Sequence, residues 1–252
     1  MITLRSISSK MKHTTHLKLA SSYTNTQPKT IRILAYGDSL TAGTSPPMDQ
    51  LFPYGPSLEN ELNELYADSD VSVVVRWRGL PGWTASTMVE HLDDSFVGLR
   101  SAVSGIKDPA LSLVIILAGT NDIGMLTSSM TKDASVEEAV ETILGLHKAC
   151  LELDQNDSSN DVQLQTLAVG IPGSAWQQMN PSAKKLCDDM NASLKEFAAS
   201  SFDGRVTYVD FPFEYSQGDS KWSGDGLHFS PEGYEVLGVE LAKSVKKILD
   251  DL

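Results

Sequence analysis

Short apolar segments alternate with longer segments of helical periodicity after residue 30. The short segments are rich in β-branched residues and apolar on both faces, which is typical of strands buried in a parallel sheet. The predicted strands are Arg32–Tyr36, Val71–Arg76, Leu113–Ala118, Gln163–Val169 and Arg205–Val209. The periodic segments predict helices over Tyr54–Tyr66, Thr84–Leu92, Ser95–Ser104, Val136–Leu153, Met179–Ser200 and Pro231–Leu249.

Two of these helices have clear N-terminal signals. Ser135 and Glu138 have the spacing of a capping box, and Ser230 precedes a proline that suits the first helical position. The last helix also repeats apolar residues on one stripe, at Tyr234, Leu237, Leu241, Val245 and Ile248. The stripe predicts that the last helix is structural.

The alternation of strands and helices predicts the α/β class, with one open, doubly wound parallel sheet and right-handed crossovers. Ligands of such sheets bind at the carboxyl ends of the strands. Ser39 directly follows the first predicted strand, and it therefore lies on the expected ligand face.

The segment Gly37-Asp38-Ser39-Leu40 has two interpretations. Glycine, aspartate and serine favour turns, so the segment is consistent with a simple turn that Asp38 braces by hydrogen bonds to the backbone. Alternatively, Ser39 is a nucleophile. A serine hydroxyl is a poor nucleophile without help, so this second interpretation requires a base and an acid that orients it.

The loop before the last helix supplies both groups. Asp225 and His228 are three residues apart, which lets the carboxylate reach Nδ1–H of the imidazole and leaves Nε2 free to accept the Ser39 proton. Asp210, after the fifth strand, is a weaker competitor for the role of the acid. His91 and His147 occur in predicted helices and are expected at the surface.

Hydrolysis of an ester also requires donors directed at the developing oxyanion. Asn121 follows the third strand and offers a side-chain amide, while the segment after the second strand offers backbone N–H groups at Gly79 and Gly82. Thr84 is a plausible cap for the helix that follows. These polar segments all fall at the same edge of the predicted sheet.

Charge and composition narrow the classes of partner. The formal net charge of −13 argues against a nucleic-acid partner, and no apolar segment is long enough to span a bilayer. The sequence has no G-x-S-x-G, Walker A or H-E-x-x-H motif, so these rival chemistries lack their residues. The two cysteines, Cys150 and Cys187, indicate neither a disulfide framework nor a zinc site.

Residues 1–30 form a basic segment rich in Ser and Thr, and residues 1–37 contain none of the 33 Asp and Glu residues of the chain. This composition is typical of an organellar transit peptide and also of a polar tail. We therefore expect a soluble protein, cytoplasmic or organellar, that is not clearly secreted, with the folded domain over residues 31–252.

Four motifs now appear in order: GDSL at 37–40, the glycine within LPGWT, GTND at 119–122 and DGLH at 225–228. From about residue 31 onward the chain resembles an SGNH hydrolase of the GDSL esterase/lipase family. The resemblance implies a single-domain, flavodoxin-like three-layer fold with a five-stranded parallel sheet. It also implies Ser39 as nucleophile, His228 as base and Asp225 as its orienting acid. The implied oxyanion donors are Ser39 N–H, the Asn121 amide and the N–H of Gly82, which is chosen over Gly79 by the motif.

The expected activity is hydrolysis of carboxylic esters of short to medium acyl chain, through an acyl-enzyme and without cofactor or metal. The substrate is a small molecule, and an open pocket is expected, lined by Met125, Leu126, Trp176 and Trp222. The alternatives of the same fold are a thioesterase, a lysophospholipase, a carbohydrate acetylesterase or an acyltransferase. A non-catalytic ligand-binding module is the alternative from another class.

Overall fold

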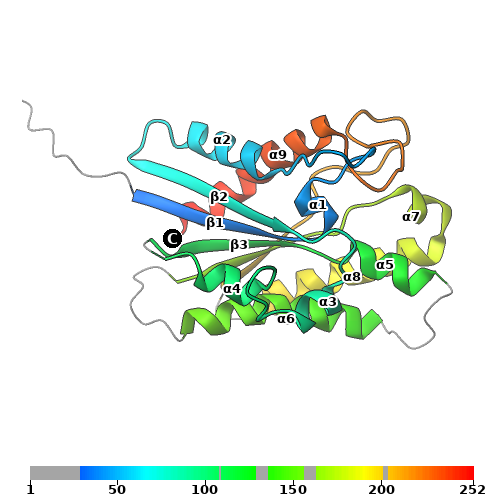
Figure 1. Ribbon diagram of the computed structural model, residues 1–252, viewed down its shortest axis with the longest axis horizontal. Coiled ribbons are helices and arrows are strands. Elements are labelled where there is room, and N and C mark those ends of the chain that lie inside the picture. The colour runs from blue at the N-terminus through cyan, green and yellow to red at the C-terminus, as the bar shows by residue number, and fades with distance from the viewer. Residues whose placement is uncertain (1–28, 108, 129–135, 156–162, 201–203) are drawn as a thin grey trace, which may run out of the picture.

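Five parallel strands form one sheet at the centre of the molecule, with helices on both faces (Figure 1). The computed structural model describes residues 29–107, 109–128, 136–155, 163–200 and 204–252. The strands are β1 (Lys29–Gly37), β2 (Val71–Gly79), β3 (Leu111–Leu117), β4 (Gln165–Val169) and β5 (Val206–Val209). The helices are α1 (Ser39–Ala42), α2 (Gly55–Leu65), α3 (Ala85–Glu90), α4 (Leu99–Ser104), α5 (Thr120–Thr127), α6 (Val136–Gln155), α7 (Ala175–Met179), α8 (Pro181–Ser200) and α9 (Pro231–Asp250).

The strand order is β2-β1-β3-β4-β5, the order of flavodoxin-like folds. The chain passes from β1 to β2 on one side and then crosses to β3 on the other side of β1. Ligands bind where the strand order reverses in this way, outside the carboxyl ends of the strands. Gly37 at the end of β1 is paired with both Gly79 of β2 and Leu117 of β3, so these three strands end at the same level. The fold class predicted from the sequence is confirmed.

Alternate residues of the central strands face two separate cores. Ile33 and Ala35 of β1 pack toward α2 and α9, whereas Leu34 and Tyr36 pack toward α3, α4 and α6. This division follows from the two-residue period of a strand, and it explains why the strand sequences are apolar on both faces. In Figure 1, α2 and α9 lie above the sheet and α3, α4, α6 and α8 lie below it.

The structure confirms both signals predicted for the last helix, its N-terminal cap and its apolar stripe. Ser230 caps α9, since its Oγ accepts a hydrogen bond from Gly233 N at 3.0 Å. The predicted stripe faces the core, where Tyr234, Leu237, Leu241 and Val245 are buried. Ser135 of the other N-terminal signal lies outside the described residues.

Two helices, α4 and α8, begin later than predicted. In each case a polar side chain forms hydrogen bonds with backbone N–H groups just before or at the start of the helix. Asp94 Oδ1 accepts hydrogen bonds from Phe96 N and Val97 N, which forms a turn, and α4 begins only at Leu99. Likewise Asn180 Oδ1 accepts from Ser182 N and Ala183 N at the start of α8.

Three short helices form where turns or loops were expected: α1, which begins within the GDSL motif, α5 after Gly119 and α7 after Ser174. They have four, eight and five residues. Segments of one or two turns are too short to show a helical period in the sequence, which is why they were missed.

The predicted basic segment over residues 1–30 falls almost wholly outside the described residues, which begin with Lys29 and Thr30 in β1. No helix in the part of the chain that the structure describes has the length and apolar character to cross a bilayer.

Candidate active site

Ser39 is the first residue of α1, in the turn after β1, and it is buried, with 6% of its surface exposed. Asp38 caps this helix, because its Oδ1 accepts a hydrogen bond from Leu40 N at 2.9 Å. The strand therefore passes directly into a helix, and Ser39 is held at the carboxyl end of β1. The prediction that Asp38 braces the turn is confirmed.

The carboxyl of Asp38 is fully buried, and its Oδ2 has no hydrogen-bond partner among the described residues. Burial is the main reason why the pKa of Asp38 is raised to about 7; the hydrogen bond from Leu40 opposes this shift, and the nearby carboxyl of Asp122 contributes to it. Below neutral pH this group is therefore mostly uncharged.

The loop from Ser223 to His228 is built around the carboxylate of Asp225. Its Oδ1 accepts from Ser223 Oγ at 2.7 Å and from the N–H groups of Leu227 and His228 at 3.0 Å each. Its Oδ2 lies 2.7 Å from His228 Nδ1. Burial raises the pKa of Asp225, but these hydrogen bonds outweigh it, led by that from His228, and hold the pKa at about 2.

The ionised carboxylate fixes the tautomer of His228. It can only accept hydrogen bonds, so Nδ1 of the neutral imidazole carries the proton and Nε2 is left as an acceptor. That Nε2 lies 3.0 Å from Ser39 Oγ, although the two residues are 189 positions apart in the chain. The structure thus brings together Ser39, His228 and Asp225 in the expected order.

Gly82 lies in a tight turn after β2. Trp83 N donates to Leu80 O at 3.1 Å, Pro81 occupies the second position, and Gly82 in the third has a φ of +80°. These are the features of a type II β-turn, which requires a positive φ at that position and therefore favours glycine. A Cβ at Gly82 would have no described atom within 4 Å, so this side of the turn faces open space.

Asn121 lies in the first turn of α5, next to the turn that holds Gly82. Its Nδ2 donates to Trp83 O at 2.9 Å, which uses one of the two N–H groups of the amide. Asp122, which the sequence analysis did not single out, is 3% exposed and accepts from Ala85 N. Burial raises the pKa of Asp122 to about 6, against the opposing hydrogen bond from Ala85.

The predicted pocket residues divide between the rim and the core. Met125 and Trp176 are 38% and 43% exposed, whereas Leu126 is partly buried against the core between α5, α6 and α8. Trp222 is placed in the core rather than on an open wall, where its ring packs against Phe229 at a centroid distance of 4.7 Å. Its position in the loop before His228 gave no signal of this burial.

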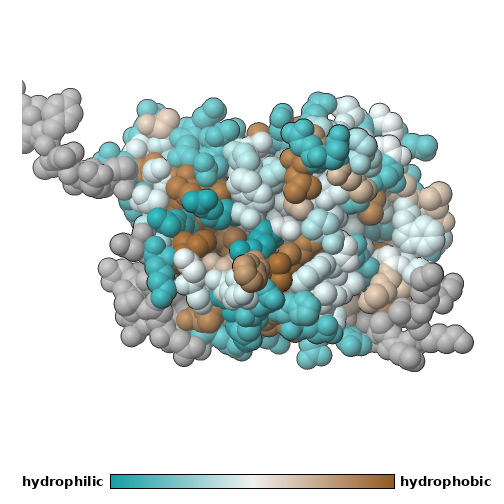
Figure 2. Space-filling view, viewed as in Figure 1, coloured by the Kyte–Doolittle hydropathy of each residue, from teal (hydrophilic) through white to brown (hydrophobic). Residues whose placement is uncertain are grey.

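Helix α7 lies beside the predicted site and joins two of its parts. Ala175 N donates to Gly226 O at 2.8 Å, and Trp176 Nε1 donates to Thr127 Oγ1 at 2.8 Å. The first bond attaches α7 to the loop of His228, and the second attaches it to α5. Trp176 and Met179 of this helix are both exposed. Figure 2 shows hydrophobic residues in separate patches on a mostly polar surface.

Other candidate residues take structural roles. Asp210 accepts from Tyr208 O–H and does not replace Asp225. His147, expected at the surface, is fully buried because α6 packs its side against β4, and its Nδ1 lies 3.0 Å from Thr166 Oγ1. Among the described residues, no group of three or more His, Cys, Asp or Glu is placed to hold a metal ion.

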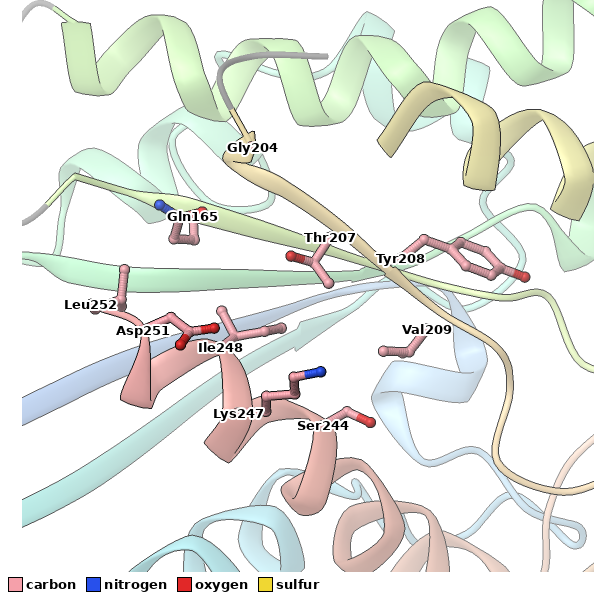
Figure 3. A pocket seen from close by; sticks show the side chains of 10 residues that line it. All are labelled: Gln165, Gly204, Thr207, Tyr208, Val209, Ser244, Lys247, Ile248, Asp251 and Leu252. Atoms are coloured by element: carbon pink, nitrogen blue, oxygen red, sulfur yellow. The ribbon is translucent and has the colours of Figure 1, made fainter. Parts of the chain in front are cut away.

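A hollow of about 400 Å³ lies between β5 and the C-terminal half of α9 (Figure 3). Gln165 and Gly204, at the amino ends of β4 and β5, belong to its lining. Its lining also follows β5 as far as Val209, and none of its residues belongs to the predicted site.

Comparisons with known proteins agree on the fold. The chain is similar to solved structures of a carbohydrate acetylesterase from Sinorhizobium meliloti (TM-score 0.61, 19% identity, 86% of this chain and 99% of that chain) and of the M. smegmatis aryl esterase (0.61, 20%, 86% and 99%). It is also similar to a lipase/acylhydrolase from Enterococcus faecalis (0.54, 20%, 86% and 96%). The search of curated proteins finds no match.

Sequence comparison then gives the family. The model of the GDSL-like lipase/acylhydrolase family matches residues 35–236, which span most of the chain and contain Ser39, Asp225 and His228. The chain therefore belongs to the GDSL-like lipase/acylhydrolase family and is a carboxylic ester hydrolase with the SGNH fold.

Proposed function

We propose that the chain hydrolyses esters of short to medium acyl chain through a triad of Ser39, His228 and Asp225 and an acyl-enzyme. The observation that carries this proposal is the continuous hydrogen-bond chain from Asp225 Oδ2 through the imidazole to Ser39 Oγ, with distances of 2.7 Å and 3.0 Å. With Nδ1 protonated, Nε2 has a lone pair directed at the hydroxyl whose proton it must accept.

In the first half of the proposed reaction, Ser39 Oγ attacks the acyl carbon while His228 Nε2 takes its proton. The negative charge that develops on the carbonyl oxygen is stabilised by the N–H groups of Ser39 and Gly82 and by the free N–H of Asn121. His228 then gives its proton to the departing alcohol, and the acyl group remains on Ser39 as an ester.

In the second half, water replaces the alcohol. His228 accepts a proton from the water as it attacks the acyl carbon, and the same donors hold the second oxyanion. Ser39 leaves with the proton from His228, which releases the acid and restores the free enzyme. Throughout, Asp225 stays ionised and stabilises the charged imidazole, and it does not itself take the proton.

The rim supports a small substrate with an apolar part. Trp176 and Met125 are exposed, and Ala175, the residue before Trp176, donates to Gly226 O in the loop that carries His228. A flat indole at the rim suits an aryl group or the face of a sugar ring. The solved neighbours include an aryl esterase and a carbohydrate acetylesterase, and both names are compatible with such a rim.

The test is hydrolysis of p-nitrophenyl esters from acetyl to palmitoyl, with an acetylated sugar assayed in parallel. We expect the highest kcat/KM at short chains and a loss on the order of 10⁴-fold or more in Ser39→Ala. Ser200→Ala, at the far end of α8, is the matched control and should keep full activity. Undiminished turnover in purified Ser39→Ala would contradict the mechanism, and a maximum at palmitoyl would contradict the substrate class.

A further inference from the structure

Two adjacent residues of α5 hold the loop between β2 and α3 at two points. Asn121 Nδ2 donates to Trp83 O at 2.9 Å, and the carboxyl of Asp122 accepts from Ala85 N at 3.1 and 3.2 Å. One residue thus supplies a donor and its neighbour an acceptor to backbone groups two residues apart. We call this pair of contacts the Asn121–Asp122 clamp.

The clamp sits immediately after the turn that contains Gly82. On the other side of that turn, Leu80 N donates to Gly37 O at 2.8 Å, at the end of β1. The turn is therefore fixed at both ends while Gly82 itself faces open space. Its orientation relative to Asn121 depends on these anchors, because no described atom supports Gly82 from the open side.

Asp122 is an unusual choice for such an anchor, because burying a carboxyl is costly unless it is well hydrogen-bonded. It is 3% exposed, and the N–H that it accepts belongs to the first residue of α3, one of the donors that a helix leaves unpaired. Thr84 Oγ1 already serves another of these donors, at Thr87 N. A simple cap for α3 was therefore present without Asp122.

We propose that Asp122 is a positioning residue for the oxyanion donors, and this proposal rests on the proposed function. By holding Ala85 while Asn121 holds Trp83, it sets the N–H of Gly82 and the free N–H of Asn121 around one point. Asp122 touches no reacting atom. Preorganised donors lose much of their effect when they move, and a displacement of about 1 Å costs on the order of 10²-fold in rate.

The first test compares variants of Asp122 by steady-state kinetics on p-nitrophenyl acetate. Asp122→Ala should lower kcat by about 10- to 100-fold with little change in KM, because the donors act on the transition state. Asp122→Asn keeps an acceptor oxygen at the same place and should recover most of the rate. If Asp122→Ala is too unstable to purify, Asp122→Ser replaces it, since its hydroxyl stops where the carboxyl carbon lay and cannot make the contact.

Thr84→Ala is the matched control, because it removes the other cap of the same helix. It should lower the unfolding temperature and leave kcat unchanged. An equal loss of kcat in Thr84→Ala and Asp122→Ala would overturn the proposal, since capping of α3 alone would then explain both.

A double-mutant cycle separates positioning from a general structural role. Because Asp122 acts through donors that include Asn121, the cost of Asp122→Ala should be much smaller in an Asn121→Ala background. Full additivity would overturn the proposal, and so would unchanged kcat in Asp122→Ala with an active wild type. If the wild type has no activity that depends on Ser39, it is the proposed function that fails.

Discussion

Two aspartates on either side of the contact between Ser39 and His228 have opposite electrostatic character. Asp225 accepts four hydrogen bonds from its own loop and has a pKa of about 2. Asp38 accepts one from Leu40, leaves Oδ2 unpaired among the described residues, and has a pKa of about 7. The hydrogen bonds of its loop therefore keep Asp225 ionised at neutral pH, whereas Asp38 is mostly uncharged below pH 7.

The difference shows that burial and hydrogen-bond donors, and not the residue type, set the charge at each position: burial dominates at Asp38, and hydrogen bonds outweigh it at Asp225. An ionised Asp225 stabilises the imidazolium that the proposed mechanism requires. A second anion directly behind Ser39 would instead oppose the negative charge that develops on the substrate oxygen. Burial keeps Asp38 mostly neutral below pH 7, although its Oδ1 accepts the hydrogen bond from Leu40 N by which it caps α1.

The largest effect is expected when the charge of Asp225 is removed. Asp225→Asn keeps the shape of the side chain but cannot hold Nδ1 protonated by a full negative charge. We expect kcat to fall on the order of 10⁴-fold in ester hydrolysis. Asp210→Asn, on the exposed aspartate after β5, is the control and should be active. A loss of less than about 10-fold in Asp225→Asn would remove this residue from the triad.

The opposite change is expected at Asp38, in the free energy of unfolding. Its folded-state pKa is raised, so its stabilising contribution is complete below its unfolded pKa, about 4, and is lost as the pH rises through about 7. Asp38→Asn cannot ionise and still caps α1. Relative to the wild type it should gain stability between about pH 4 and pH 7, by up to about 1.4 kcal/mol per pH unit, and keep that gain at higher pH. Urea unfolding at pH 5 and pH 8.5 tests this, and an equal difference at both pH values would contradict it.

At acidic pH, the free energy of unfolding should depend on the ionisation of Asp225. Its folded-state pKa is lowered, so its contribution is present above about pH 4 and is lost as the pH falls through about 2. The stability advantage of the wild type over Asp225→Asn should therefore shrink between pH 4 and pH 2. Thermal unfolding across this range measures it, and a constant gap would show that the hydrogen bonds do not depend on the charge.

The smallest effect is expected at the rim. Trp176→Ala should raise KM for aryl acetates by a few-fold to about 10-fold with little change in kcat, because the indole binds substrate and transition state alike. Phe96→Ala is the matched control, since Phe96 is the most exposed aromatic side chain of those described, at 83%. Equal KM values for the two variants would exclude Trp176 from substrate binding.

The sequence predicted the sheet well because strands such as Leu113–Ala118 are buried on both faces and leave little ambiguity. It also predicted that Ser39, Asp225 and His228 meet, since each follows a strand or precedes a helix at one edge of the sheet. It could not predict α1, α5 or α7, because their few residues show no period. Asp122 was missed because its partner, Ala85 N, is a backbone group 37 positions away.

Burial of single side chains was the other feature that the sequence could not provide. Trp222 and His147 both carry polar nitrogens and fall in segments expected to be accessible, yet both are buried. Trp222 Nε1 donates to Glu214 O at 3.3 Å, and His147 Nδ1 contacts Thr166 Oγ1. These partners lie 8 and 19 positions away in the chain, and only the folded arrangement shows that they are within reach.

The proposed mechanism depends on Ser39 as the nucleophile that His228 activates. The most direct measurement is reaction with a fluorophosphonate, which phosphonylates an activated serine and releases fluoride, followed by mass spectrometry of the intact protein and its peptides. The account predicts one adduct, on Ser39, that is absent in Ser39→Ala and forms far more slowly in His228→Ala. An adduct on another residue, or ester hydrolysis that continues after Ser39 is fully modified, would contradict it.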